Sequence, residues 1–190
     1  MTQEIEIEFK NLITVEEYRR LLHAYSFPQE GKKQINYYFE TPDQDLKKHG
    51  CALRIREKSD TYTLTLKEPH PNGLLETHDK IEAETCQKWI HGRITPQPFT
   101  SKQLDRLGIQ PENLKYMGNL ETIRREISFK GALLVLDIST YNHHMDYEFE
   151  LEASNESLGS QLFESILTEQ KIPKRNTPNK IKRFYKTLHD

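Results

Sequence analysis

Several short segments of the sequence carry full charges at every second position. Like charges on one face of a strand repel each other unless another group compensates them. A divalent cation would compensate the glutamates, whose oxygen ligands favour Mg²⁺ or Mn²⁺. A polyphosphate anion would compensate the arginines and lysines. The pattern therefore indicates a metal–polyphosphate site made of these residues: Glu6, Glu8 and Lys10; Arg54 and Arg56; Lys67; Asp137; Glu148, Glu150 and Glu152.

A second interpretation of the same residues involves no ligand. The charged faces could simply point into water, as they do on any half-buried sheet. Solvent exposure is the usual situation of charged side chains, so the alternation alone favours this interpretation. The choice between the two depends on whether the charged faces enclose a lumen.

The elements that would position these side chains are mostly strands. A period of two predicts strands over residues 3–10, 35–41, 51–58, 62–67, 74–79, 120–129, 132–140 and 147–153. Most connections have hairpin length, so we expect antiparallel meander order. Eight such strands can close into a barrel that holds one small ligand. We therefore predict an α+β fold, an eight-stranded antiparallel β-barrel with helices packed outside.

Helical patterns fill the gaps between the strands. Thr14 and Glu17 have the spacing of a capping box. Residues 80–114 contain helical pieces, with Trp89 as the expected core anchor, and amphipathic segments follow around residues 158–167 and 180–188. The basic runs 171–175 and 180–186 are typical of solvated helix faces, and contact with nucleic acid is the rarer meaning of such runs.

Composition limits the possible partners. The chain has 190 residues, 29% charged and 35% hydrophobic, with a formal net charge of −2. We expect one domain over residues 1–190 and neither nucleic acid nor a membrane as a partner. The start of the sequence has no signal-peptide pattern, and Cys51 and Cys86 are expected to be buried reduced thiols, so we predict a cytoplasmic protein. The sequence gives no indication of the oligomeric state.

The charged segments also resemble those of a known family. Glu6-Ile7-Glu8-Phe9-Lys10 is similar to the N-terminal ExExK signature of the CYTH superfamily, which has a barrel called the triphosphate tunnel. The resemblance continues in order over nearly the whole chain, through NYYFET, LRIR, LTLKEP, Ile123-Arg124, VLDIS, ELE and NKIKRFY. Within the superfamily, the YjbK-type subgroup of Firmicutes is the most similar.

The resemblance implies roles for individual residues. Phosphate oxygens would be held by Lys10, Arg54, Arg56, Lys67, Arg124 and Lys180. One or two Mg²⁺ or Mn²⁺ ions would be held by Glu6, Glu8, Glu150 and Glu152, with Asp137 and Glu148 as further ligands. Glu8 and Lys67 are the expected catalytic residues, and Lys67 either protonates the leaving phosphate or only binds phosphate, the simpler role.

Two segments depart from the family pattern. The expected fifth strand reads LLETH. Glu76 takes the site role that the resemblance implies for this strand, and His78 is added as a weaker candidate. Phe39 stands where some thiamine triphosphatases use a tyrosine, which argues against thiamine triphosphate as the substrate.

The predicted function is metal-dependent hydrolysis of a small triphosphate-containing molecule, with inorganic triphosphate first. Phosphoryl transfer needs positioned charge rather than a serine or cysteine nucleophile. Two alternatives stay open: a non-catalytic sensor that binds polyphosphates or nucleotides, and a class IV adenylate cyclase. Several carboxylates beside a phosphate site favour an enzyme over an anion binder.

Overall fold

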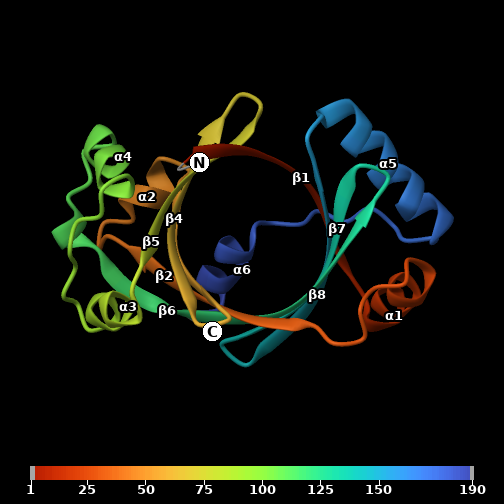
Figure 1. The fold of residues 1–190 in the computed structure, drawn as a ribbon, viewed down its shortest axis with the longest axis horizontal. Helices are drawn as coiled ribbons and strands as arrows, with labels where there is room; N and C mark the ends of the chain where they lie inside the picture. The colour runs from red at the N-terminus through yellow and green to blue at the C-terminus, as the bar shows by residue number, and fades with distance from the viewer. Residues whose placement is uncertain (1–2, 189–190) are drawn as a thin grey trace. The chain divides into compact units, whose positions relative to one another are not determined.

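The computed structural model describes residues 3–188, and its strands lie where the alternation predicts them. They are β1 (Gln3–Ile13), β2 (Lys32–Glu40), β3 (Ala52–Lys58), β4 (Thr61–His70), β5 (Gly73–Ile81), β6 (Lys115–Phe129), β7 (Ala132–Tyr141) and β8 (His144–Ala153). The strands close into a barrel in the order β1-β5-β4-β3-β2-β6-β7-β8 (Figure 1). The predicted α+β barrel is confirmed.

The strand order departs from a plain meander at two connections. β2 to β5 and β6 to β8 follow the chain, but β1 lies between β5 and β8 rather than beside β2, and β6 lies beside β2 rather than beside β5. Neither connection is a hairpin turn, because the helix α1 (Val15–Ala24) follows β1 and a segment with several helical pieces follows β5. Thr14 caps α1 in the predicted capping box with Glu17.

Two compact units make up the chain. One contains Gln34–Leu120 with the start of β1 up to Ile5, and the other contains Glu6–Lys33 and the chain from Glu121 onward. The prediction of a single domain over residues 1–190 stays a prediction.

In the first unit, helices α3 (Ala83–Ile90) and α4 (Thr100–Arg106) pack on one side of β4 and β5 (Figure 1). The shorter α2 (Asp45–Lys48) and a 3₁₀ turn, η1 (Pro111–Asn113), complete this unit. Alternation directs Leu53 and Ile55 of β3 into the apolar layer beneath the helices, where Trp89 is 1% exposed. The predicted role of Trp89 as a core anchor is confirmed, and both cysteines are buried free thiols.

In the second unit, α1 and α5 (Glu156–Glu169) lie on one side of β7 and β8, and α6 (Lys180–Lys186) lies on the other (Figure 1). The apolar layer under α5 includes Phe149 and Leu151 of β8, and the Phe149 ring stacks on Phe163 with 5.5 Å between centroids. Because successive side chains of a strand alternate, Glu148 and Glu150 must face the side that carries α6. None of the helices in residues 3–188 combines the length and the apolarity that a membrane crossing requires.

Candidate active site

Three buried carboxylates meet on the α6 side of β7 and β8. Asp137 of β7 lies opposite Glu148 of β8, and Glu150 lies opposite Lys10 of β1. Asp137 and Glu148 are fully buried, and Glu150 is 4% exposed. Carboxylates at such depth require compensating charge.

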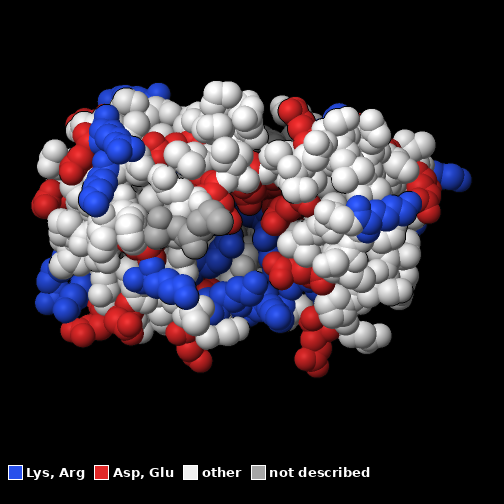
Figure 2. Space-filling view, turned by 45° about the horizontal axis from the view of Figure 1, so that its top comes forward, with Lys and Arg blue, Asp and Glu red and all other residues white. Residues whose placement is uncertain are grey.

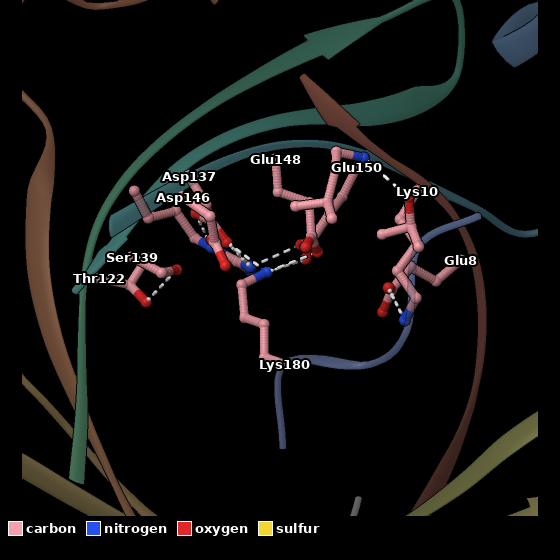
Figure 3. A network of polar contacts seen from close by, with 12 residues as sticks. Glu8, Lys10, Thr122, Asp137, Ser139, Asp146, Glu148, Glu150 and Lys180 are labelled. Atoms are coloured by element: carbon pink, nitrogen blue, oxygen red, sulfur yellow. Dashed lines mark hydrogen bonds and ion pairs between the residues drawn. The ribbon is translucent and has the colours of Figure 1, made fainter. Parts of the chain in front are cut away.

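Cations of the chain itself supply that compensation (Figure 3). The Lys180 Nζ, at the start of α6, lies 2.8 Å from Glu148 Oε1 and 2.9 Å from Asp137 Oδ2, and it also contacts Glu150. Arg124 of β6 lies opposite Asp137 and donates to both of its oxygens. The Arg124 Nη2 also lies 2.6 Å from Glu150 Oε2. The structure thus pairs residues predicted as phosphate ligands with residues predicted as metal ligands.

The electrostatics of Glu148 and Glu150 differ although they are neighbours on one face. Burial raises the pKa of Glu148 to about 7, against the opposing effect of Lys180. Burial would also raise the pKa of Glu150, but Lys180 and Arg124 outweigh it and hold this pKa well below its usual range. Glu150 is therefore the more acidic member of the pair.

Sequence reasoning missed Arg183: the resemblance named Lys180 as a phosphate ligand, and the basic run 180–186 was otherwise interpreted as a solvated helix face. The Arg183 side chain is only 9% exposed, and it ion-pairs with Asp146, at 3.0 Å, and with Glu148. The solvated-face interpretation is wrong for Lys180 and Arg183, but Lys182 is exposed. The spacing offered a signal, because residues three apart share one side of a helix.

A subset of the carboxylates can hold a metal ion. Glu8, Glu148 and Glu150 each offer one oxygen, and these oxygens lie within 4.8 Å of one another. Three carboxylate oxygens form a donor set that suits Mg²⁺ or Mn²⁺, so the residues fit the predicted cofactor. Glu8 also accepts a hydrogen bond from Lys10 at 2.9 Å. The predicted ligands Glu6 and Glu152 are half-buried and lie outside this group of three.

The first unit presents basic side chains on β3 and β4. Arg56 Nε donates to Asn36 at 3.1 Å, and Lys67 is ion-paired with Glu76. For Arg54 the structure of residues 3–188 gives no hydrogen bond or ion pair, and its Nε is buried. A partly buried guanidinium without a carboxylate is a strong candidate for binding an external anion.

The weaker candidate, His78, lies on β5 in the same cross-strand row as Arg54. Its Nδ1 is 3.0 Å from the Thr65 hydroxyl, and its Nε2 lies 3.3 Å from Glu4 and 3.4 Å from Glu76. These two glutamates and His78 form a second group with metal-ligand spacing. The structure therefore places Glu76 and His78, the two site candidates on β5, in one group.

The interpretation of Phe39 needs a correction. Phe39 is fully buried in the apolar layer, and its ring meets Trp89 edge-on, with 5.3 Å between centroids. The residue paired with Arg54 across β2 and β3 is Tyr38. Phe39 therefore faces away from the charged residues and carries no information on the substrate, because alternation places its neighbour there instead.

Figure 2 shows Lys and Arg side chains gathered near the middle of the displayed face, with Asp and Glu side chains beside them. The formal net charge of the whole chain is −2. That nucleic acid is not a partner stays a prediction from this overall balance.

Comparisons with known proteins find a matching family, a similar protein and a similar solved structure. The profile of the CYTH domain matches residues 4–185. A Bacillus subtilis (strain 168) protein named "Putative triphosphatase YjbK" is 42% identical over 186 residues, which cover 97% of this chain and 96% of that protein. A crystal structure from Bacillus halodurans, described as a "putative adenylate cyclase", is 40% identical, with a TM-score of 0.93 and coverage of 97% and 100%.

A more distant structure shares the fold. It is HpAC1 from Hippeastrum, described as a "putative adenylyl cyclase" with a dominant triphosphatase activity. It is 23% identical to this chain, with a TM-score of 0.81 and 96% of each chain covered.

Proposed function

The chain belongs to the CYTH domain family, and from that premise we propose that it is a divalent-metal-dependent hydrolase of small triphosphate-containing molecules. Inorganic triphosphate is the first candidate substrate. The observation that carries the proposal is the combination of a carboxylate group with metal-ligand spacing and a guanidinium, Arg54, with no carboxylate partner among residues 3–188. The relative named "Putative triphosphatase YjbK" supports the same reaction class.

The proposed cation site consists of Glu8, Glu148 and Glu150. A bound Mg²⁺ or Mn²⁺ would neutralise phosphate charge and orient a water molecule toward the terminal phosphorus. Glu8 is the member of this group that we assign to catalysis, because it belongs to the half-buried part of β1 that solvent can reach. We keep Glu6, Glu152 and Asp137 outside the set of direct ligands.

The proposed phosphate ligands are the basic side chains to which the family resemblance assigns this role. Arg54 and Arg56 offer planar forks to phosphate oxygens, and Lys67 offers a point charge. Lys10, Arg124 and Lys180 contribute further positive charge.

In the reaction, a water oxygen forms a bond with the terminal phosphorus, and the bond from that phosphorus to its bridging oxygen breaks. The products are phosphate and, from inorganic triphosphate, diphosphate.

The decisive experiment measures products from a panel of substrates. Inorganic triphosphate, ATP and thiamine triphosphate are incubated with Mg²⁺ or Mn²⁺, and phosphate, diphosphate and cyclic nucleotide are quantified. We expect phosphate release that stops in excess EDTA. Cyclic nucleotide with diphosphate from ATP would indicate a cyclase instead, and tight binding without turnover of any compound would indicate a sensor.

A matched pair of variants tests whether phosphate release depends on the proposed cation site. Glu8→Gln keeps the shape of the side chain and removes its charge, and we expect it to abolish phosphate release. Glu16→Gln makes the same change at an exposed position of α1 and should leave turnover unchanged. Full activity of Glu8→Gln would contradict the proposed metal site.

A further inference from the structure

Lys180 occupies the position that a divalent cation would need. Its Nζ lies 2.8 Å from Glu148 Oε1 and contacts Glu150 Oε1. Both carboxylates belong to the group with metal-ligand spacing. An ammonium and a divalent cation at the same oxygens would repel each other strongly at such depth, because the low-dielectric interior screens charge poorly.

The remaining oxygen of Glu150 is also engaged. Glu150 Oε2 lies 2.6 Å from Arg124 Nη2, and Arg124 is fixed by its two bonds to Asp137. Arg124 therefore cannot give way without breaking a buried bidentate pair. The Lys180 side chain is the cation that can move, since its long stem has many rotamers.

The attachment of α6 permits this movement. Lys180 is the first residue of α6, and the Asn179 side chain makes no capping hydrogen bond there. Further along the helix, Phe184 is fully buried and Arg183 is paired with Asp146. The helix is thus held at Arg183 and Phe184, while the Lys180 side chain can leave its carboxylates without undocking α6.

We propose that Lys180 and a divalent cation compete for Glu148 and Glu150, so that metal binding releases the Lys180 ammonium, which then becomes available to a phosphate group. In the absence of metal, Lys180 neutralises the acidic group and keeps it folded. The inference rests on the proposed function, because it assumes the cation site at Glu8, Glu148 and Glu150. It adds an order of events, in which the metal binds before Lys180 engages the substrate.

The first test is a Mn²⁺ titration followed by electron paramagnetic resonance, without any phosphate compound. The proteins are the unmodified chain, Lys180→Gln and Lys182→Gln. Lys182 is exposed two positions further along the same helix, so its variant removes the same charge without touching the carboxylates. We expect Lys180→Gln to bind Mn²⁺ about tenfold more tightly, equivalent to about 1.4 kcal/mol, and Lys182→Gln to stay within about twofold of the unmodified chain.

The second test uses the unmodified chain and does not depend on how a variant folds. Lysines are reductively methylated with and without Mg²⁺, and the extent at each position is measured by mass spectrometry. The Lys180 side chain is 12% exposed, so its methylation should be slow without metal. We expect Mg²⁺ to accelerate methylation of Lys180 several-fold and to leave Lys182 unchanged.

The outcomes separate two failures. If unmodified chain and Lys180→Gln bind Mn²⁺ equally well and Lys180 stays protected with Mg²⁺ bound, the competition is refuted while the metal site stands. If Lys182→Gln gains as much affinity as Lys180→Gln, long-range charge explains the effect and the competition is again refuted. If neither protein binds Mn²⁺, the metal site and the proposed function fail together with the inference.

Discussion

Arg124 and Asp137 face each other across β6 and β7 as a buried bidentate ion pair. Arg124 Nε donates to Asp137 Oδ1 at 2.9 Å, and Nη2 donates to Oδ2 at 2.7 Å. Asp137 is fully buried and Arg124 is 9% exposed. Arg124 therefore engages both oxygens of Asp137, and we propose that Asp137 positions Arg124 rather than binding a metal ion.

The pair should matter for stability. We expect Asp137→Asn to lower the free energy of unfolding by about 3 kcal/mol, because removing one charge of a buried pair leaves the other uncompensated. This loss of stability should lie at the low end of the range for broken buried ion pairs, since Glu150 still contacts Arg124. Urea denaturation measures it, with the exposed Asp105→Asn as a control expected within about 0.5 kcal/mol of the unmodified chain. Equal stability of both variants would contradict the structural role of Asp137.

Alternation along the strands was sufficient to predict which face each charged residue occupies. Leu136 and Phe149 are fully buried in the apolar layer under α5, as the period of two requires. Asp137 and Glu148, one position away, therefore meet on the opposite face. The barrel and its charged face follow from the same rule, because burying one face of each strand determines the register of the other.

Alternation does not determine partners across strands. The ion pairs of Lys180 with Glu148 and Glu150 join a helix and a strand 30 or more positions apart, and only the three-dimensional packing brings them together. Arg183 also pairs with residues of β8, and only its spacing of three from Lys180 on the same helix pointed to it in the sequence. The resemblance at Phe39 does not bear on the substrate, because alternation along β2 places Tyr38, and not Phe39, opposite Arg54.

Arg54 provides a test of the phosphate site. Because the structure of residues 3–188 gives it no ion pair, Arg54→Gln should change stability by less than about 1 kcal/mol. Loss of a charge-assisted contact should weaken triphosphate binding by about 1.5–3 kcal/mol, or about 10- to 150-fold. Calorimetry measures the affinity, and the exposed Arg93→Gln is the matched control. Unchanged affinity of Arg54→Gln would exclude Arg54 from the phosphate site.

Gly159 allows α5 to lie close to the strands. A Cβ at this position would lie 2.6 Å from Phe9 Cε2 and 2.8 Å from the Ala153 Cβ. Overpacking should cost about 1–3 kcal/mol, against a gain in helix propensity of at most about 1 kcal/mol. We therefore expect Gly159→Ala to destabilise the protein by about 1–2 kcal/mol, measured by thermal unfolding.

The control for this position is Ser157→Ala, an exposed change in the same helix. A second variant, Phe9→Leu with Gly159→Ala, should recover part of the loss, because the smaller side chain makes room for the added methyl group. Additive effects of the two changes would show that Phe9 is not the residue that limits the approach of α5.

Glu17 provides a pH-dependent test of how the loop before α6 is anchored. Its carboxylate accepts hydrogen bonds from Arg175 at 2.7 and 2.9 Å and from the Thr14 N–H at 2.8 Å. Burial opposes ionisation, but Arg175 and Thr14 outweigh it and lower the pKa of Glu17 below its ordinary value of 4.5.

A carboxyl group with a lowered pKa stabilises the folded state fully above its ordinary pKa, and this contribution is lost as the pH falls through the folded-state pKa. We expect Glu17→Gln to cost about 1–2 kcal/mol at pH 7, because a charged hydrogen-bonding group is lost and Arg175 is partly exposed. Denaturation at a series of pH values should show this difference shrinking below pH 4.5, since the unmodified carboxyl is then protonated as well. The exposed Glu16→Gln should show no such pH dependence. A difference that stays constant from pH 7 into the acid range would mean that Glu17 acts through its shape rather than through its charge.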